Sequence, residues 1–439
     1  MRKRSLRISL ISVAVLAVVV AITLLSVYFA TSKKMSEYVE CQVVKLDGRY
    51  KTTVDKRFGK YLGHPDLVEI DGTLMTFYPS GHGKGAIIGK VSNDLGQSWQ
   101  DMTNLPKSWV NSMETPCVYK LTRTDGSQVL VLTSGCPNWA ADGILPDGFN
   151  SSLSFDGGKT WSEFDHLYGK EWALSEFGDS NKAYDGVVAM SSLTQLKDKD
   201  GRFIDKWMAT FHRGAHDKGM DAGNGYTNYR TYLTIEGDKA VWSRPEPIFT
   251  EQQHILEDKY GMCELEIIRN EKDGCLIMLA RPNRRVSNAL ICYSYDEGET
   301  WSDPRQLPNC LTGDRHKAEY DPVSGKLIIS FRQLLQDGDK YKTNAFAADS
   351  VMSEGWVAWV GDFDDLMSYA DGDSANDAYG DALIVLGKNY KGADCGYSGV
   401  VILGDGTAIL HSYGYFDAGA TKPYIMQTKF KINDVIKSK

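Results

Sequence analysis

The sequence predicts an all-β protein, a six-bladed β-propeller preceded by one N-terminal transmembrane helix. Three observations support this prediction: a charge-free apolar segment, a short turn motif that recurs, and six hairpin-like segments at similar spacing. The chain of 439 residues is 42% hydrophobic and 24% charged, a composition typical of a folded globular protein. Its 42 glycines and 23 tyrosines favour many short strands joined by tight turns.

The first expected element is the apolar segment 8–30, which contains no charged residue. At a rise of about 1.5 Å per residue, a helix of this length crosses a hydrocarbon core of about 30 Å. Basic residues flank it on both sides: Arg2, Lys3, Arg4, Arg7, Lys33 and Lys34. Because more positive charge precedes the segment than follows it, we expect the N-terminus to stay in the cytoplasm. The alternative is a cleaved signal peptide, which would release a secreted protein.

These features divide the chain into a cytoplasmic tail (1–7), a transmembrane signal-anchor (8–30), a stalk (31–45) and an outer propeller domain (46–439). The formal net charge of −8 argues against a nucleic-acid partner. The eight cysteines show neither a CxxC pair nor zinc-type spacing, so we expect no metal and no other cofactor. An extracytoplasmic location permits disulfides between them, and buried free thiols are the alternative.

The turn motif S-x-D-x-G-x-[ST]-W occurs three times, at 92–99, 154–161 and 294–301. Its aspartate can accept hydrogen bonds from turn amides, its glycine allows positive φ, and its tryptophan can pack beneath the turn. The second gap between copies is close to two repeat units. We therefore expect a degenerate copy between them, at 234–242.

Six longer segments each contain an apolar strand, a turn and a second apolar strand. They begin at similar spacing along the chain, at 64–83, 114–135, 185–214, 263–283, 316–333 and 396–416. Strands that return at a regular interval indicate stacked units that bury one another's faces. Six units of roughly 66 residues fit a propeller with four antiparallel strands per blade.

Polar residues stand at one end of these hairpins, where a propeller has the mouth of its central channel. Before the first strands come His64, Glu114, Asp185, Glu264, His316 and Tyr397, and after the second strands come His82, His212, Arg213, Arg281 and Arg332. Carboxylates, arginines and histidines that converge on one mouth are typical of a ligand-binding or catalytic site.

The turn motif and two of these segments resemble the sialidase superfamily, whose propellers carry such turns as Asp boxes. Glu264 begins a strand and Arg281 ends its partner seventeen positions later, and Gly396-Tyr397-Ser398 is similar to the stretch that holds the family's catalytic tyrosine. The resemblance implies that Tyr397 attacks the anomeric carbon and that Glu264 takes its proton. A tyrosine of ordinary pKa, about 10, needs such a neighbouring base. Arg281 and Arg332 would bind an acidic group of the substrate.

The sequence also departs from the sialidase pattern. Gly63-His64-Pro65 stands where the family has Arg-Ile-Pro, so the first of three carboxylate-binding arginines is missing. The stretch 80–85, where the resemblance places the catalytic acid, contains no acidic residue. We expect His82 to replace the acid as proton donor and Arg213 to replace the lost arginine from another blade.

A glycosidase acting on a sugar other than sialic acid would use a pair of carboxylates. The candidates for such a pair are Glu264, Asp185, Glu114 and Asp394. His64, His82, Lys84 and His316 would then hold hydroxyl groups or a charged substituent.

The leading hypothesis is a membrane-anchored, exo-acting glycoside hydrolase that cleaves terminal sugars from glycans outside the cytoplasm. One alternative is a carbohydrate-binding propeller, a lectin or adhesin, that has lost catalysis. Another is a polysaccharide lyase in which His82 and Tyr397 move a proton next to a uronate.

Overall fold

The computed structural model describes residues 39–82, 85–111, 115–136, 148–167, 187–214, 226–336, 351–352, 355–371 and 379–436. Within these ranges no helix has the length and apolar character needed to cross a membrane. The predicted transmembrane segment 8–30 lies outside the described residues, so it stays a prediction.

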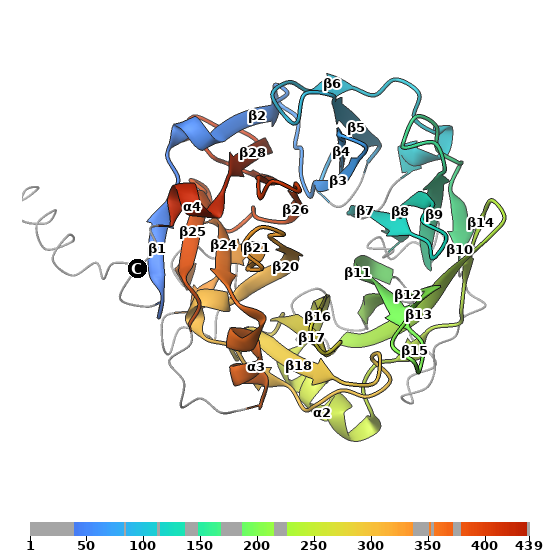
Figure 1. The fold of residues 1–439 in the computed structure, drawn as a ribbon. Helices are drawn as coiled ribbons and strands as arrows, with labels where there is room; N and C mark the ends of the chain where they lie inside the picture. Colours follow the sequence, from blue (N-terminus) through green and yellow to red (C-terminus); the bar gives the residue numbers. More distant parts are fainter. Residues whose placement is uncertain are drawn as a thin grey trace, which may run out of the picture.

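The described residues form a ring of six antiparallel blades around a central channel, which confirms the predicted all-β six-bladed propeller (Figure 1). Each predicted hairpin supplies the two innermost strands of one blade: β3–β4, β7–β8, β11–β12, β16–β17, β20–β21 and β26–β27. In Figure 1 the first strand of each pair lies nearest the centre of the ring.

The first three blades follow one another along the chain. The first contains β3 (Asp66–Ile70), β4 (Thr73–Pro79), β5 (Ile87–Ser92) and β6 (Gln100–Asp101). The second contains β7 (Pro116–Thr122), β8 (Gln128–Cys136), β9 (Gly148–Ser154) and β10 (Asp165–Leu167). The third contains β11 (Val187–Lys197), β12 (Phe203–Gly214), β13 (Tyr226–Glu236) and β14 (Lys239–Trp242), with β15 (Glu246–Pro247) paired to β13.

The last three blades include strands from both ends of the described chain. The fourth contains β16 (Met262–Arg269), β17 (Leu276–Pro282), β18 (Leu290–Ser294) and β19 (Arg305–Gln306). The fifth contains β20 (Gly313–Tyr320), β21 (Leu327–Gln333), β24 (Trp356–Gly361), β25 (Ala382–Gly387) and β1 (Gln42–Lys45). The sixth contains β26 (Ser398–Ile402), β27 (Ala408–Gly414), β28 (Tyr424–Phe430) and β2 (Lys51–Asp55).

The ring is closed by strands that the sequence analysis did not predict. β2 pairs antiparallel with β28 and completes the sixth blade, while β1 pairs parallel with β25 at the outer edge of the fifth blade. β1 lies within the segment 31–45 that was predicted as a stalk. Its pairing moves the start of the propeller from residue 46 to Gln42.

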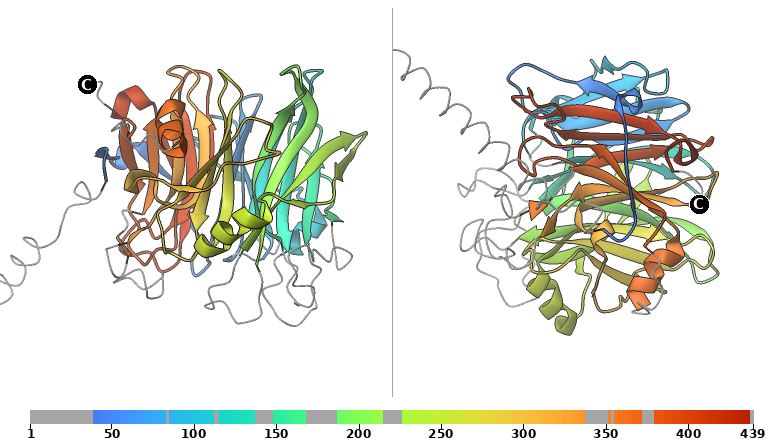
Figure 2. Two further views of the ribbon diagram at one scale, coloured as in Figure 1. Left: turned by 90° about the horizontal axis from the view of Figure 1, so that it is seen from below. Right: turned by 90° about the vertical axis from the view of Figure 1, so that its left-hand side faces the viewer.

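Short helices and a separate two-stranded pair lie between or beside the strands of the blades. They are η2 (Gly48–Tyr50), η3 (Lys107–Asn111), α2 (Glu251–Tyr260), η4 (Asn309–Leu311), β22–β23 (Leu335–Gln336 and Val351–Met352), α3 (Phe363–Asp371) and α4 (Ile432–Val435). Figure 2 shows α2 and α3 on the outside of the ring. α2 leads directly into β16. Its N-cap Thr250 forms a capping box with Gln253, and Gly261 ends it in the left-handed conformation with φ of 62°.

The three copies of the turn motif form the same hydrogen-bonded turn. In each copy the aspartate (Asp94, Asp156 or Asp296) accepts bonds of 2.9 Å from the backbone N–H and 2.6 Å from the hydroxyl of the residue four positions later. The hydroxyl of Ser98 is the main reason that the pKa of Asp94 falls to about 2. The expected degenerate copy is the β13–β14 hairpin, whose Trp242 packs against Phe149 at 5.0 Å between ring centroids.

Hydrophobic side chains fill the interfaces between neighbouring blades. Leu279, Ile291, Phe331 and Trp359 pack between the fourth and fifth blades, for example, and each is fully buried. The other interfaces contain comparable clusters. The eight cysteines are free thiols, seven of them buried, so the alternative of free thiols holds in the structure. Burial between blades fixes the radial position of each inner strand, and with it the residues at the channel mouth.

Candidate active site

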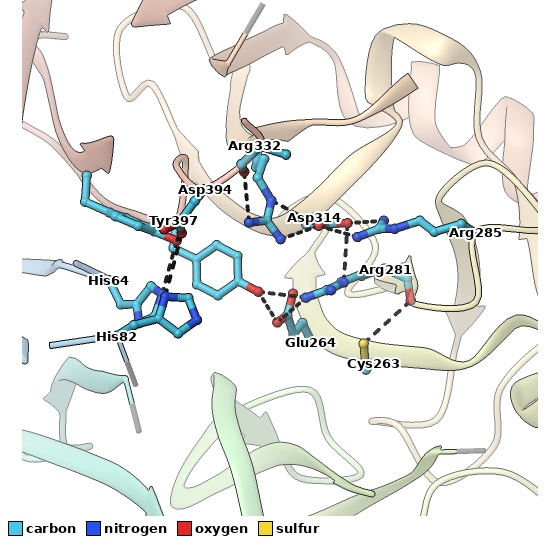
Figure 3. A network of polar contacts seen from close by, with 12 residues as sticks. His64, His82, Cys263, Glu264, Arg281, Arg285, Asp314, Arg332, Asp394 and Tyr397 are labelled. Carbon is cyan, nitrogen blue, oxygen red and sulfur yellow. Dashed lines mark hydrogen bonds and ion pairs between the residues drawn. The ribbon is translucent and has the colours of Figure 1, made fainter. Parts of the chain in front are cut away.

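Three predicted residues meet in one hydrogen-bonded group at the channel mouth. The hydroxyl of Tyr397, just before β26, donates to Oε1 of Glu264 on β16. Nη1 of Arg281, on β17, lies 2.8 Å from that same carboxylate oxygen and 2.7 Å from the Tyr397 hydroxyl (Figure 3). All three side chains are at least nine-tenths buried. A phenol, a carboxylate and a guanidinium group are therefore joined without an intervening residue.

The backbone of the inner strands is strained where these side chains enter the mouth. His64, Glu264 and Arg315 stand at equivalent points of three blades and have positive φ of 55°, 53° and 54°. Pairing in the strands of Glu264 and Arg315 shifts register at these points, between Cys263 and Glu266 and between Asp314 and Lys317. Left-handed backbone in residues other than glycine is costly and persists where the surroundings enforce it. The strain turns these three side chains toward Tyr397.

The ring of Tyr397 is enclosed by cationic and aromatic groups. The His64 ring lies 5.1 Å from it, and the guanidinium carbons of Arg332 and Arg315 lie 5.1 and 5.7 Å from its centroid. Arg315 also donates a 2.9 Å hydrogen bond to the sulfur of Cys117 in the second blade. Contacts from the first and fifth blades thus fix the orientation of the phenol, and the second blade holds Arg315 in place.

The charges of this group favour an ionised Glu264 beside a neutral Tyr397. Burial acts to raise the pKa of Glu264, but Arg281 and Arg315 outweigh it and the pKa lies below its usual value. Burial raises the pKa of Tyr397, and Arg281 opposes that rise. An ionised carboxylate that already accepts the phenol hydrogen bond is arranged to take the phenol proton.

Three arginines surround a carboxylate that the sequence analysis did not single out. Asp314, on β20, accepts bonds from both terminal nitrogens of Arg285 and from Nε and Nη2 of Arg332. Nε of Arg281 lies 3.4 Å from the same carboxylate. Arg332 also donates to the carbonyl of Ala393 at 3.1 Å. This arginine cluster (Arg281, Arg285 and Arg332) is connected to the Tyr397 group through Arg281.

A second polar group, next to Tyr397, contains His64, His82 and Asp394. Asp394 accepts hydrogen bonds from the hydroxyls of Tyr61 at 2.9 Å and Tyr413 at 2.8 Å. Because both phenols donate to Asp394, the histidine nitrogens that meet them must be donors: His82 Nδ1 to Tyr61 at 2.6 Å and His64 Nε2 to Tyr413 at 3.1 Å. Burial lowers the pKa of His64 well below its usual value, so His64 is neutral.

Within the described residues, one set of side chains has a spacing that suits a metal ion, namely His64, His82 and Asp394, with ligand atoms within 4.8 Å of one another. Tyr61 and Tyr413 already hydrogen-bond these ligand atoms. Arg332 and Arg315 add positive charge beside His64. The chemistry of the set therefore fits a hydrogen-bonded acid–base group better than a site for a divalent cation.

The structure brings together seven of the predicted site residues: Tyr397, Glu264, Arg281, Arg332, His64, His82 and Asp394. Three others, Asp185, Glu114 and Lys84, lie outside the described residues. Arg213 lies on β12, and the description of that residue is limited to its backbone.

The prediction that His316 binds substrate is wrong, because the preceding residue, Arg315, occupies that position at the mouth. His316 is fully buried, its Nε2 bonds the carbonyl of Leu311 at 2.9 Å, and its ring packs against Phe331. The register shift between Asp314 and Lys317 gives the mouth position to Arg315. A one-residue shift in a strand exchanges the two faces, which explains the error.

Sequence reasoning missed Arg285, Asp314, Arg315, Tyr61 and Tyr413 as members of the site. Asp314 and Arg315 immediately precede the segment assigned to the fifth hairpin, and Tyr413 lies within the last one. A search for charged residues just before the first strand of each predicted hairpin would have found Asp314 and Arg315. Arg285 and Tyr61 lie in connecting segments, and no sequence signal points to them.

Comparisons with known proteins identify the fold. No family model matches the chain, and no curated protein matches it by sequence. A protein of unknown function from Dyadobacter fermentans has a TM-score of 0.57 and 15% identity, covering 87% of this chain and 97% of its own. An alpha-L-arabinanase from Penicillium chrysogenum has a TM-score of 0.53 and 12% identity, covering 88% and 99%. A Hadza microbial sialidase has a TM-score of 0.50 and 14% identity, covering 86% and 66%.

These similarities show that the chain has the six-bladed propeller fold found in sialidases and in an arabinanase. At such low identity they establish the fold and leave the chemistry to be argued from the site itself.

Proposed function

We propose that this protein is an exo-acting glycoside hydrolase in which Tyr397 is the nucleophile and Glu264 its base. The observation that carries the proposal is the hydrogen bond from the Tyr397 hydroxyl to Glu264, with Arg281 bonded to both groups. The glycosidases among the structural neighbours support it. The resemblance of the three turn motifs to the Asp boxes of sialidases, read from the sequence, also favours it.

In the first step, the Tyr397 oxygen forms a bond to the anomeric carbon while its proton passes to Glu264. The bond from the anomeric carbon to the leaving-group oxygen breaks, and that oxygen receives a proton from His82. His82 Nδ1 donates to the Tyr61 hydroxyl, which in turn donates to Asp394, and this chain holds the orientation of His82. In the second step, water attacks the anomeric carbon and gives a proton to His82, while the bond from that carbon to the Tyr397 oxygen breaks and Glu264 returns its proton to the phenol. The products are a free sugar and an alcohol, and the enzyme regains its starting state.

Arg281 has an electrostatic role in this scheme. Its bond to the Tyr397 oxygen stabilises the negative charge that develops there as the proton leaves. His64 is neutral and packs on the Tyr397 ring, so it positions the nucleophile and does not act as the acid.

The location of the enzyme belongs to the same proposal. The apolar segment 8–30 and its basic flanks support a single-pass anchor with a cytoplasmic N-terminus and a catalytic domain outside. A carbohydrate at the outer membrane face is then the substrate.

The test compares the full chain with Tyr397→Phe on a panel of aryl arabinosides, sialosides and other aryl glycosides, together with uronate polymers. We expect hydrolysis by the native protein and none by Tyr397→Phe, with little change in the unfolding temperature because the aromatic ring and the Arg281–Glu264 ion pair remain. Tyr295→Phe, at an exposed tyrosine of the third turn motif, is the matched control and should keep full activity.

Full activity of Tyr397→Phe would exclude the tyrosine mechanism. An increase in ultraviolet absorbance on uronate polymers would indicate a lyase. Sugar binding without turnover by the native protein would indicate a lectin.

A further inference from the structure

The arginine cluster at the mouth is already occupied by a side chain of this protein. Asp314 is fully buried and contacts all three guanidinium groups of the cluster (Figure 3). Arg285 donates from its two terminal nitrogens to the two different oxygens of Asp314, whereas Arg332 donates to Oδ2 alone, from Nε at 3.0 Å and Nη2 at 2.5 Å. The two-oxygen contact of Arg285 is the way in which arginine recognises a carboxylate ligand.

The backbone is built to place this carboxylate. Asp314 pairs with Arg332 across β20 and β21, directly before the register shift that gives Arg315 its mouth position. A Cβ atom on the preceding residue, Gly313, would lie 2.1 Å from the Arg332 carbonyl oxygen. Glycine at this point allows the close approach of the two strands, and that approach brings Asp314 against Arg332.

The charge state of Asp314 matches its surroundings. Burial acts to raise its pKa, but Arg281, Arg285 and Arg332 together hold the pKa far below the usual value. The carboxylate is therefore ionised and neutralises part of the cluster. An external carboxylate would have to displace Asp314 from its arginines, which would leave a buried carboxylate without its partners and is strongly unfavourable.

We propose that Asp314 is a built-in substitute for an acidic substrate group, so that the sugar bound at Tyr397 is uncharged. The proposal rests on the proposed function for the identity of the ligand as a sugar, but the occupancy of the cluster can be tested without turnover. Asp314 is thus a specificity-determining residue. It contacts Arg281 and Arg332, the two arginines that the sequence resemblance assigned to an acidic substrate group.

The experiment measures carboxylate binding rather than activity. Asp314→Ala removes the internal carboxylate and leaves a space lined by three arginines. We expect it to bind acetate saturably, with a Kd on the order of millimolar as expected for so small a ligand. The native protein should show no saturable acetate binding, by isothermal titration or by the chemical shift of labelled acetate.

Two controls keep the result interpretable. Asp66→Ala removes another buried aspartate, one that accepts backbone N–H groups of Leu67 and Val118 at 2.9 Å, and it should not bind acetate. If Asp314→Ala unfolds in plain buffer, it is refolded in sodium acetate and in sodium chloride of equal ionic strength. Recovery that is specific to acetate supports the proposal.

Several outcomes would overturn the proposal. In the titration, these are acetate binding by the native protein or no acetate binding by folded Asp314→Ala. In the refolding experiment, they are equal recovery of Asp314→Ala in acetate and in chloride, or recovery in neither salt. Native turnover of sialosides in preference to neutral glycosides would overturn it while leaving the Tyr397 mechanism intact. Conversely, full activity of Tyr397→Phe would exclude the tyrosine mechanism without changing the acetate binding of Asp314→Ala. Failure of the proposed function and failure of the Asp314 proposal are therefore distinguishable.

Discussion

The guanidinium group of Arg281 donates a hydrogen bond of 2.7 Å to the phenol oxygen of Tyr397. The donor is buried and already charged, so it need not reorganise when the phenol loses its proton. This single contact opposes the effect of burial, which raises the pKa of Tyr397 and would otherwise make the phenol a weak nucleophile. Four predictions follow from this site and its surroundings.

Arg281→Gln should lower kcat by about 10²- to 10³-fold, the usual effect of losing one donor to a developing oxyanion. Because the contact strengthens as charge develops on Tyr397, we expect KM to change much less than kcat. Steady-state kinetics on an aryl glycoside cleaved by the native enzyme test this, with exposed Arg305→Gln as the control. A change confined to KM would instead show that Arg281 contributes only to ground-state binding.

The pH dependence of turnover should reflect the lowered pKa of Glu264. A base works while it is ionised, and Arg281 and Arg315 keep Glu264 ionised below its ordinary pKa. Activity should therefore persist as pH falls, with the acid limb of kcat/KM below about 4.5, the value for an ordinary glutamate. Arg315→Gln should move this limb to higher pH. An acid limb that does not move in Arg315→Gln would contradict this electrostatic account.

The stability of the propeller should fall as pH rises from about 4.5 to 7 because of Glu266. This residue lies in the channel wall, where Glu266, Lys317 and Glu319 help to line a cavity of about 540 Å³ that Tyr397 does not reach. Burial raises the pKa of Glu266 to about 7. Between its unfolded and folded pKa values the folded state binds the extra proton, so stability is greatest below the unfolded value.

Glu266→Gln should abolish that pH dependence. The rise in the pKa of Glu266 corresponds to about 3 kcal/mol in the free energy of unfolding. At pH 8 the native protein has lost this stability, so Glu266→Gln should be more stable than the native protein by about that amount in urea unfolding. Glu271→Gln, at an exposed position nearby, should behave like the native protein. Equal pH dependence in Glu266→Gln and the native protein would assign the effect to other groups.

Thiol titration should distinguish buried from accessible cysteines. Cys41 is the partly exposed cysteine, whereas the other seven are buried. The adjacent Cys41 thiol and burial both raise the pKa of Cys310, which slows its reaction further. We expect about one reactive thiol in the native protein and eight after denaturation. Six after denaturation would show that a disulfide has formed, and peptide mapping would then test whether it joins Cys41 and Cys310.

The number of blades and their inner strands could be predicted because each hairpin is local in sequence. The paired apolar runs and their turns lie within about thirty residues, so periodicity alone reveals them. The roles of β1 and β2 could not be predicted in this way. Their partners, β25 and β28, lie more than three hundred residues away, and short edge strands carry little pattern of their own.

The same distinction applies to the site. Tyr397, Glu264 and Arg281 carry a recognisable motif, and the structure places them in direct contact. Asp314 has no motif, because its importance arises from arginines that come from separate strands and a loop. The fifth blade was predicted with the wrong residue at the mouth because its inner strand shifts register between Asp314 and Lys317. The left-handed backbone at Arg315 lies within this shift, so Arg315 occupies the position expected for His316.

Closure of the ring by β2 has a mechanical consequence. β2 is the outer strand of the blade whose inner edge carries Tyr397, and β1 precedes it on the neighbouring blade. A force applied ahead of Gln42 therefore loads the parallel β1–β25 pair first, in shear, and reaches β2 only after β1 has detached. The β1–β25 pair therefore lies, along the chain, between the segment ahead of Gln42 and the blade that carries Tyr397.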